Sequence, residues 1–172
     1  GDLRDFLHLE LHNDFGLHRE PTDVREVLAE AVTEMSTAFG RAEAPLESSL
    51  PPSLPEADAD PDRLRRVFLA VLAHAKKFRA KGVVRVAAKA EGAWTVVTVA
   101  FDSLSVPPDA RAGMLDLWLP AAAREGRGTA CVGLGLGFAA ALTRLHGGSF
   151  DFALDDANAC LITIRLPAKG AA

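Results

Sequence analysis

The run Gly133-Leu-Gly-Leu-Gly137 is the segment whose residue types and spacing most directly suggest chemistry. Its glycines, Gly133, Gly135 and Gly137, leave backbone N–H groups open to a ligand, and a helix N-terminus favours bound phosphate through its dipole. The run fails as a dinucleotide-binding fingerprint, because it follows no predicted strand and its third glycine comes one position early. Two interpretations stay open: a backbone cradle for phosphate, and a flexible helix entry that binds no ligand.

Charge is distributed unevenly along the chain. The net charge is −4, but residues 1–66 hold 15 acidic and 7 basic side chains, whereas residues 67–172 hold 8 acidic and 12 basic ones. The densest basic stretch precedes Glu91 and comprises Lys76, Lys77, Arg79, Lys81, Arg85 and Lys89. Such a stretch forms either a solvated face or a surface that attracts phosphate or an acidic partner. The net negative charge argues against general nucleic-acid binding, so no nucleic-acid partner is predicted.

The histidines and cysteines indicate structure more than chemistry. His8 and His12 lie four residues apart, a spacing that can ligate a metal or mark a phosphoacceptor, but no third ligand accompanies them and no metal site is predicted. His146 precedes two glycines and is expected to end a helix and to interact favourably with its dipole. Cys131 and Cys160 are too few for a disulfide framework and are expected to be small core residues.

The composition is that of one globular domain. Hydrophobic residues make up 49% of the 172 residues and charged residues 24%, which excludes a disordered chain. No apolar stretch is long enough to cross a membrane, and the N-terminus shows no signal-peptide pattern. We therefore expect a cytoplasmic domain cut from a longer protein, since Gly1 is followed at once by helix-like sequence. Whether that longer protein is membrane-anchored stays open.

Hydrophobic periodicity and turn signals define the elements. Asp23 and Glu26 form a capping-box pair at the start of one helix, and Asp60 followed by Pro61 signals a second. The predicted order is a helix over 23–39, a weak strand within 45–61, a helix over 61–78, a hairpin of 83–90 and 93–101 around Glu91-Gly92, an irregular loop over 102–132, a helix over 133–146, and a hairpin of 149–154 and 160–166. Strands joined by tight turns pair antiparallel. The predicted fold class is a two-layer α+β sandwich with a mixed, mostly antiparallel sheet and helices on one face.

Four segments together carry a resemblance to a known family. They are residues 17–28 (LHREPTDVREVL), residues 60–78 (DPDRLRRVFLAVLAHAKKF), Asp102 at the end of a hairpin strand, and the glycine run followed by LTRLHGG (142–148) and LITIRLP (161–167). Their order and approximate spacing resemble the ATP-binding domain of sensor histidine kinases, whose Bergerat-type fold is shared with Hsp90-like and gyrase-like ATPases. The resemblance covers nearly the whole chain. It implies that residues 1–20 end a dimerisation helix and its linker and that residues 21–168 form the ATPase domain, with residues 169–172 as a frayed tail.

The helix over 61–78 departs from the family at the positions that hold the metal. The family's N-box reads roughly N-L-L-x-N-A-x-K-F, whereas this chain has Ala70-Val-Leu-Ala-His-Ala-Lys-Lys-Phe78 and so has lost both asparagines. Positions 70, 74 and 77 share one helix face, which in the family offers an amide oxygen to Mg²⁺ on the ATP phosphates. His74 offers a nitrogen that suits Zn, Cu or Ni better, and Ala70 offers nothing. Lys77 can still meet a phosphate as a point charge.

The first glycine box of the family is eroded as well. Where the family has D-x-G-x-G, this chain has Asp102-Ser-Leu-Ser-Val106. The side chains of Leu104 and Val106 fill space and penalise the backbone conformations that glycine allows. Asp102 is then either the family's adenine-reading aspartate or a plain turn residue at the end of a strand.

Two functions from different classes follow from the resemblance. The favoured one is a degenerate domain that has weak or no Mg-ATP binding and acts by docking a dimerisation helix pair or the receiver domain of a response regulator, as a homodimer in the full-length protein. The alternative is an active domain that transfers the γ-phosphoryl of ATP to a histidine on an adjoining domain. A relative of the anti-sigma-type serine kinases is disfavoured, because residues 3–28 resemble the exit of a dimerisation helix.

The resemblance also names the site and its cofactor. The nucleotide-binding residues, vestigial or weak, are expected to be His74, Lys77, Asp102, Gly133, Gly135 and Gly137, and no catalytic residue is predicted within the chain. ATP with Mg²⁺ is the implied cofactor, although the lost asparagines and glycines argue against its productive binding. The phosphorylated histidine is expected upstream of residue 1.

Overall fold

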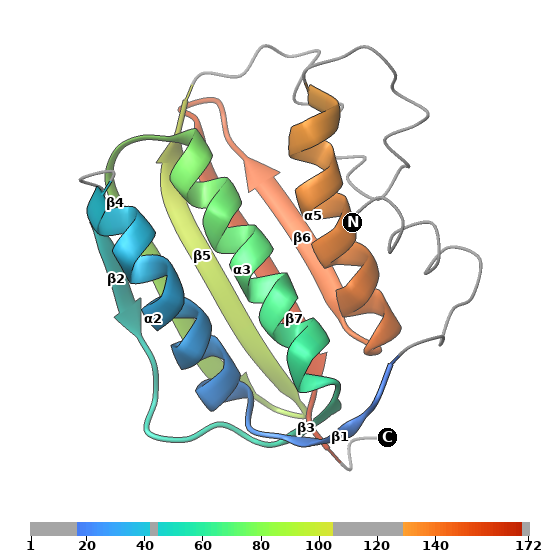
Figure 1. Cartoon of the computed structure of the whole chain (residues 1–172). Coiled ribbons are helices and arrows are strands. Elements are labelled where there is room, and N and C mark those ends of the chain that lie inside the picture. The colour runs from blue at the N-terminus through green and yellow to red at the C-terminus, as the bar shows by residue number, and fades with distance from the viewer. Residues whose placement is uncertain (1–16, 42–44, 105–128, 170–172) are drawn as a thin grey trace.

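A five-stranded sheet forms one layer of the domain (Figure 1). The computed structural model describes residues 17–41, 45–104 and 129–169. The strands of this sheet follow the order β2-β4-β5-β7-β6, in which β2 runs parallel to β4 and every other neighbouring pair is antiparallel. Their bounds are Leu46–Ser49 for β2, Arg79–Glu91 for β4, Trp94–Ser103 for β5, Ser149–Leu154 for β6 and Ala159–Pro167 for β7.

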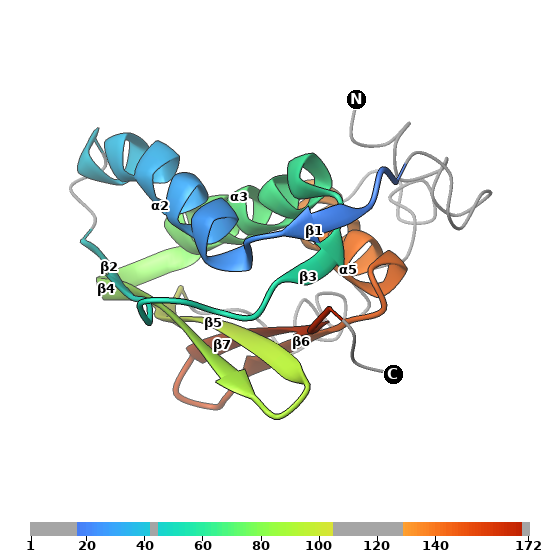
Figure 2. The same cartoon turned by 90° about the horizontal axis from the view of Figure 1, so that it is seen from below.

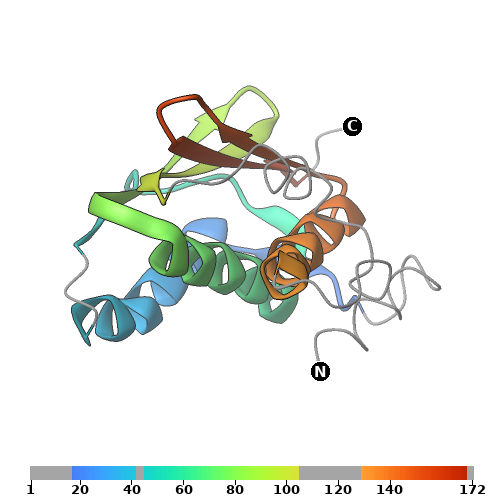
Figure 3. The same cartoon turned by 90° about the horizontal axis from the view of Figure 1, so that it is seen from above.

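Three helices cover one face of this sheet. They are α2 (Val24–Arg41), α3 (Pro61–Phe78) and α5 (Thr129–Leu145). Figures 2 and 3 show the helices gathered on the same side of the strands, with α3 between α2 and α5. The predicted class, a two-layer α+β sandwich with a mixed, mostly antiparallel sheet, is therefore confirmed.

Local signals explain why α2 and α3 begin where they do. The carboxylate of Asp60 accepts hydrogen bonds from the backbone N–H groups of Asp62 and Arg63, at 3.1 and 3.2 Å, and Pro61 occupies the first helical position. Asp23 caps α2 in the same way, with its carboxylate accepting from the N–H of Glu26 at 3.1 Å. Both caps match the sequence prediction.

The core lies between the helices and the sheet. The inward face of α3 supplies Leu64, Val67, Phe68, Val71 and Leu72, all buried. Buried residues recur at every second position of β5, at Thr95, Val97, Val99, Phe101 and Ser103, and Val96 is buried as well. Because successive side chains of a strand point to opposite faces, this alternation fixes which β5 residues meet α3 and which face away.

A second, two-stranded sheet was not predicted. In it, β1 (Glu20–Thr22) pairs antiparallel with β3 (Ala57–Ala59). The range 45–61 therefore holds two strands, β2 and β3, where the sequence indicated one. Three-residue strands are too short to show a hydrophobic period, so periodicity could not reveal them. The expected boundary after residue 20 falls inside β1.

The hairpin of β4 and β5 differs from its prediction in two details. The pairing of Glu91 with Trp94 places the two-residue turn at Gly92-Ala93, one position later than expected. Gly92 has a φ of +60°, which is the conformation that a tight hairpin turn requires. β4 also begins at Arg79, ahead of the expected start, because Gly82 adopts a φ of +82° and the strand continues through an irregular register there.

Candidate functional site

The elements that carry the predicted site residues meet at one end of the molecule. The C-terminal turns of α3, the end of β5 and the first turns of α5 all lie at this end, which is the upper one in Figure 1. The backbone N–H of Leu104 donates to the carbonyl of Phe78 at 2.7 Å, so the chain leaving β5 is tied directly to the last residue of α3. The topology thus brings together segments that are far apart in the sequence.

His74 is enclosed by aromatic rings. Its imidazole centroid lies 4.7 Å from that of Phe78 on α3, 6.1 Å from that of Phe101 on β5 and 5.9 Å from that of Phe152 on β6. Only 7% of His74 is exposed, and its Nε2 is buried without a hydrogen-bond partner among the described residues. The side chain therefore faces the sheet and fills space between α3 and the strands.

This enclosure keeps His74 neutral. Burial lowers its pKa to about 4, and the positive charge of Lys77 acts in the same direction. A neutral imidazole among phenylalanine rings behaves as a core side chain whose unpaired nitrogen reduces stability.

Lys77 and Ala70 complete the helix face that the sequence singled out. Lys77 is exposed, and its Nζ lies 5.6 Å from the centroid of the Phe78 ring, within the range of a cation–π contact. Ala70 is half-buried and carries no polar atom on its side chain. Of the three positions, only Lys77 presents a charge at this end of the molecule.

Asp102 is not brought together with His74. Phe101 is buried and contacts His74, and Asp102 follows it on β5, so the strand directs the two side chains to opposite faces of the sheet. Asp102 is exposed, and its Cα partner on β4 is Lys81. The β5 residue that shares the enclosed space with His74 is thus Phe101. The alternation of Val97, Val99 and Phe101 was the sequence signal that could have identified it.

The glycine run is not at a helix entry. The helix was expected to begin at Gly133, but α5 begins at Thr129, so Gly133, Gly135 and Gly137 belong to the body of the helix. Backbone N–H groups beyond the first turn are hydrogen-bonded within the helix. The expected start of the helix at Gly133 is therefore wrong, and the structure does not place these glycines at a helix entry. Gly137 is buried, as are its neighbours Leu136 and Phe138.

The donor set around His74 does not fit Mg²⁺. This ion requires oxygen ligands in near-octahedral geometry, whereas Ala70, His74 and Lys77 offer no oxygen ligand, and the only candidate nitrogen is buried among aromatic rings. Within the described residues there is also no cluster of three or more His, Cys, Asp or Glu side chains that could hold a metal ion.

The remaining residues that the sequence singled out are not part of the site around His74. Some are placed elsewhere in the domain, and others lie outside the residues that the structure describes. His146 follows the last residue of α5 and is buried, with both ring nitrogens in hydrogen bonds to Leu142 and Asp60. Cys160 is buried as expected, and burial raises its pKa to about 12. Leu104 is 46% exposed. His8, His12, Val106 and the side chain of Cys131 lie outside the described residues.

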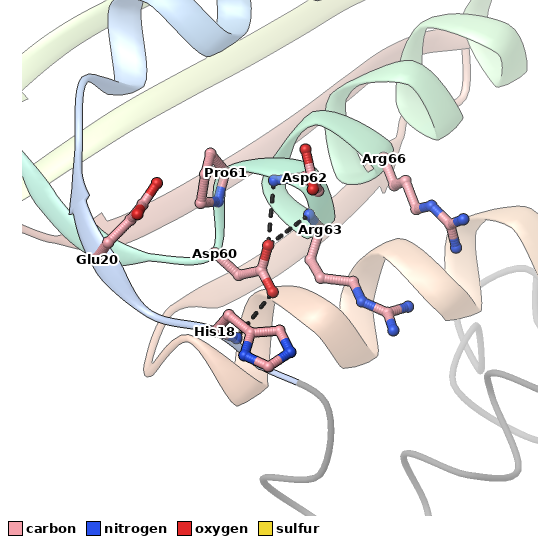
Figure 4. Close-up of a pocket in the computed structure, with 7 residues that line it drawn as sticks. All are labelled: His18, Glu20, Asp60, Pro61, Asp62, Arg63 and Arg66. Carbon is pink, nitrogen blue, oxygen red and sulfur yellow. Dashed lines mark hydrogen bonds between the residues drawn. The ribbon is translucent and has the colours of Figure 1, made fainter.

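A polar hollow lies at the opposite end of α3. It has a volume of about 520 Å³ and surrounds the N-terminus of the helix (Figure 4). Its lining residues are His18, Glu20, Asp60, Pro61, Asp62, Arg63 and Arg66. No sequence pattern indicates this hollow, because β1 contributes to it only through tertiary packing.

The fold and the position of the N-box-like helix define an ATPase-like domain of the histidine-kinase type. Residues 59–170 match the family of histidine kinase-, DNA gyrase B- and HSP90-like ATPases, and the chain belongs to this family. The resemblance to histidine-kinase ATP-binding domains drawn from the sequence is thereby confirmed.

Individual relatives support the same assignment. The chain is 29% identical over 169 residues to the histidine protein kinase DivJ of Caulobacter vibrioides, covering 96% of this chain and 28% of DivJ. Full-length ShkA, solved in complex with AMPPNP, superposes with a TM-score of 0.79 at 25% identity, over 99% of this chain and 35% of that one. The histidine kinase AdeS of Acinetobacter baumannii has the same fold, with a TM-score of 0.73 at 15% identity, over 98% of this chain and 76% of that one. The chain thus spans little more than a quarter of DivJ.

Within the residues that the structure describes, no helix combines the length and apolar character needed to cross a bilayer.

Proposed function

We propose that this chain is the ATPase-like domain of a two-component signalling protein, that it has lost productive Mg-ATP binding, and that it acts by docking. The docking partner is a pair of dimerisation helices or the receiver domain of a response regulator, within a homodimeric full-length protein. Family membership supports the signalling role. The position of His74 supports the loss of nucleotide binding.

The observation that carries the proposal is the enclosure of His74 by Phe78, Phe101 and Phe152. A nucleotide-binding position must present polar groups to phosphate or metal, and here it presents a neutral, buried imidazole whose Nε2 has no partner in the described residues. Phosphoryl transfer depends on positioning and on a metal that neutralises the phosphate charge. The side chains at positions 70, 74 and 77 supply one positive charge and no metal ligand.

Charge segregation supports the docking role. Residues 1–66 are acidic on balance and residues 67–172 are basic, and a charge difference of this kind can orient a charged partner. Such steering affects the rate and orientation of association more than its final affinity, and it weakens as salt is added.

One observation favours the alternative of an active ATP-binding domain. Lys77 is exposed at the site, and a relative at 25% identity, ShkA, was solved with AMPPNP. If the chain retains nucleotide binding, Lys77 would contact a phosphate as a point charge.

A thermal-shift titration tests the nucleotide half of the proposal. A ligand at 100 times its Kd stabilises the folded state by about 2.7 kcal/mol, which corresponds to a rise in Tm of roughly 5–10 °C for a domain of this size. With millimolar ATP, ADP or AMPPNP and Mg²⁺, we expect a shift below about 1 °C. ShkA under the same conditions is the positive control, and a shift of several degrees in this chain would contradict the proposal.

Calorimetric titration tests the docking half separately. The probes are a purified two-helix dimerisation domain and a purified receiver domain, each at low and high salt. We expect one of them to bind, with an affinity that falls as salt is raised. Absence of binding by both probes would contradict the docking role and leave the nucleotide result standing.

A further inference from the structure

The chain enters the described domain through a short segment that is held at several points. The backbone N–H of His18 donates to Oδ2 of Asp60 at 2.9 Å. The hydroxyl of Thr22 lies within hydrogen-bond distance of two carbonyls, that of Ala59 at 2.9 Å and that of Glu20 at 2.8 Å. The guanidinium of Arg19 donates to the carbonyl of Leu145, the last residue of α5. The entry segment, residues 18–22, is therefore attached to the start of α3 and to the end of α5.

Asp60 is the centre of these contacts (Figure 4). One carboxylate oxygen, Oδ1, accepts from the first N–H groups of α3, while the other, Oδ2, accepts from His18 of the entry segment. Its own backbone N–H donates to Nε2 of His146 at 3.1 Å. Only 5% of Asp60 is exposed, so each of these groups depends on a protein partner.

His146 can accept the hydrogen bond from the N–H of Asp60 in one protonation state only. Its other ring nitrogen, Nδ1, lies 2.7 Å from the carbonyl of Leu142, and a carbonyl can only accept, so Nδ1 carries the proton. Nε2 is then the acceptor for the N–H of Asp60. A second proton on the ring would place two donors against each other. With 3% of its surface exposed, His146 has little access to water as a replacement.

The two helices that meet at these contacts extend to the other end of the domain. α3 runs from Asp60 toward His74 and Lys77, and α5 runs back from the glycine run toward His146 (Figure 1). An 18-residue helix is about 27 Å long, so a small rotation at its base displaces its far end. The two helices pack side by side between these ends.

We propose that the hydrogen bond between His146 and Asp60 is a latch that couples the seating of the entry segment to the packing of α5 against α3. Displacing residues 18–22 removes a bond from Asp60 and loosens the end of α5, and loosening the end of α5 in turn releases the entry segment. Such coupling is reciprocal by thermodynamic necessity. The proposal does not depend on nucleotide binding or on the docking role.

The latch also responds to protonation of His146. Burial lowers the pKa of this histidine, and the charge of Arg19 adds to the effect, while the bond to Leu142 and the carboxylates of Asp60 and Asp58 oppose it. These groups come from the entry segment, the cap of α3, β3 and α5 itself. Because the pKa of His146 lies below the ordinary value of 6.5, acidification opens the latch only below that pH, when the ring takes up its second proton.

Amide hydrogen exchange on the whole chain tests the coupling in both directions. His146→Leu removes the acceptor, and Thr22→Val removes the hydroxyl bond that seats the entry segment. We expect His146→Leu to raise exchange of the amides of residues 18–22 at least fivefold. We expect Thr22→Val to raise exchange of residues 146–148 by a similar factor, although Thr22 does not touch them in any recorded hydrogen bond.

Thr143→Val is the matched control. The hydroxyl of Thr143 donates to the carbonyl of Ala139 at 2.7 Å within α5, so this variant removes a buried side-chain bond from the same helix without touching the entry segment. Exchange of residues 18–22 should stay at the wild-type rate. Equal effects of Thr143→Val and His146→Leu, or an effect of each variant confined to its own side, would overturn the proposal.

If His146→Leu does not fold, the proposal is tested by comparing the pH dependence of exchange in the wild type and in His146→Gln. His146→Gln keeps an acceptor near the Nε2 position and cannot be protonated. After correction for intrinsic exchange, the wild type should lose protection of residues 18–22 as the pH is lowered from 7 toward the onset of acid unfolding, whereas His146→Gln should not. Identical pH profiles for the two proteins would refute the latch.

Discussion

The imidazole of His74 and the ring of Phe78 lie 4.7 Å apart, with an angle of 33° between their planes, on successive turns of the same helix. This tilted contact makes His74, at the position where the resemblance predicted a metal ligand, part of the core. Phe101 and Phe152 close the same space from the sheet, so its polarity is set by three phenylalanines and one neutral histidine.

Replacing His74 by leucine is expected to stabilise the domain. The variant removes a buried Nε2 that has no partner in the described residues and keeps a side chain of similar size, so the free energy of unfolding should rise by about 1 kcal/mol. Denaturant unfolding measures the change. His146→Leu is the control, because it leaves the N–H of Asp60 without its acceptor and should instead cost roughly 1–3 kcal/mol. Destabilisation by both variants would mean that Nε2 of His74 has a partner.

The free energy of unfolding should fall on acidification, because the buried His74 resists protonation in the folded state. Its pKa is about 4 in the folded state and about 6.5 when unfolded, so between these values the unfolded chain binds more protons and acidification favours unfolding. This contribution is fully present above pH 6.5 and is lost as the pH approaches 4, by about 3 kcal/mol in all. Because carboxylates also titrate near pH 4, the measurement is the difference between wild type and His74→Leu across the range. Parallel stability curves would contradict the assignment.

Restoring the family's amide at position 74 should not restore nucleotide binding by itself. His74→Asn leaves Phe78, Phe101 and Phe152 in place, so we expect no thermal shift with Mg-ATP. Adding Phe101→Val removes the ring that meets position 74 from β5, and the double variant should gain a shift of about 2 °C or more. His74→Asn with Phe39→Leu is the control, since Phe39 is a buried ring on α2. If both double variants behave alike, the rings are not what excludes nucleotide.

The turn between α5 and β6 should tolerate no side chain at Gly148. A Cβ built there would lie 2.1 Å from the carbonyl oxygen of Arg165 on β7, closer than any real contact. Gly148→Ala should therefore destabilise the domain by about 3 kcal/mol or prevent folding. Gly40→Ala is the matched control, because a Cβ on this α2 glycine meets nothing within 4 Å, and alanine favours the helix by about 1 kcal/mol. Equal effects at the two positions would contradict the geometry of the turn.

The helix starts and the hairpins were predictable, because they depend on residues that are neighbours in the sequence. Asp60 with Pro61 starts α3 because a carboxylate and a preset φ satisfy the first turn locally, and Asp23 does the same for α2. Alternating β-branched residues defined both hairpins, and their turns required only a register correction at Gly92. The fold class followed from the order of these elements.

The candidate site depended on relations that are not local. Asp102 was grouped with His74 from the family pattern, but the pleat of β5 turns Phe101 toward the helix and Asp102 away from it. The glycine run was expected at a helix entry, but α5 starts before it. β1 and β3 are too short to show a period, so their pairing, and the hollow that Glu20 of β1 helps to line, exist only through tertiary contacts.

The sequence by itself determined the elements, the fold class and the family, because caps, turns and hydrophobic periods are set by neighbouring residues. Only the tertiary structure decided that His74 is sealed among rings from three elements and that His146 joins the end of α5 to the start of α3. Both outcomes depend on which faces meet when the helices pack on the sheet, and long-range packing of this kind leaves no local pattern in the chain.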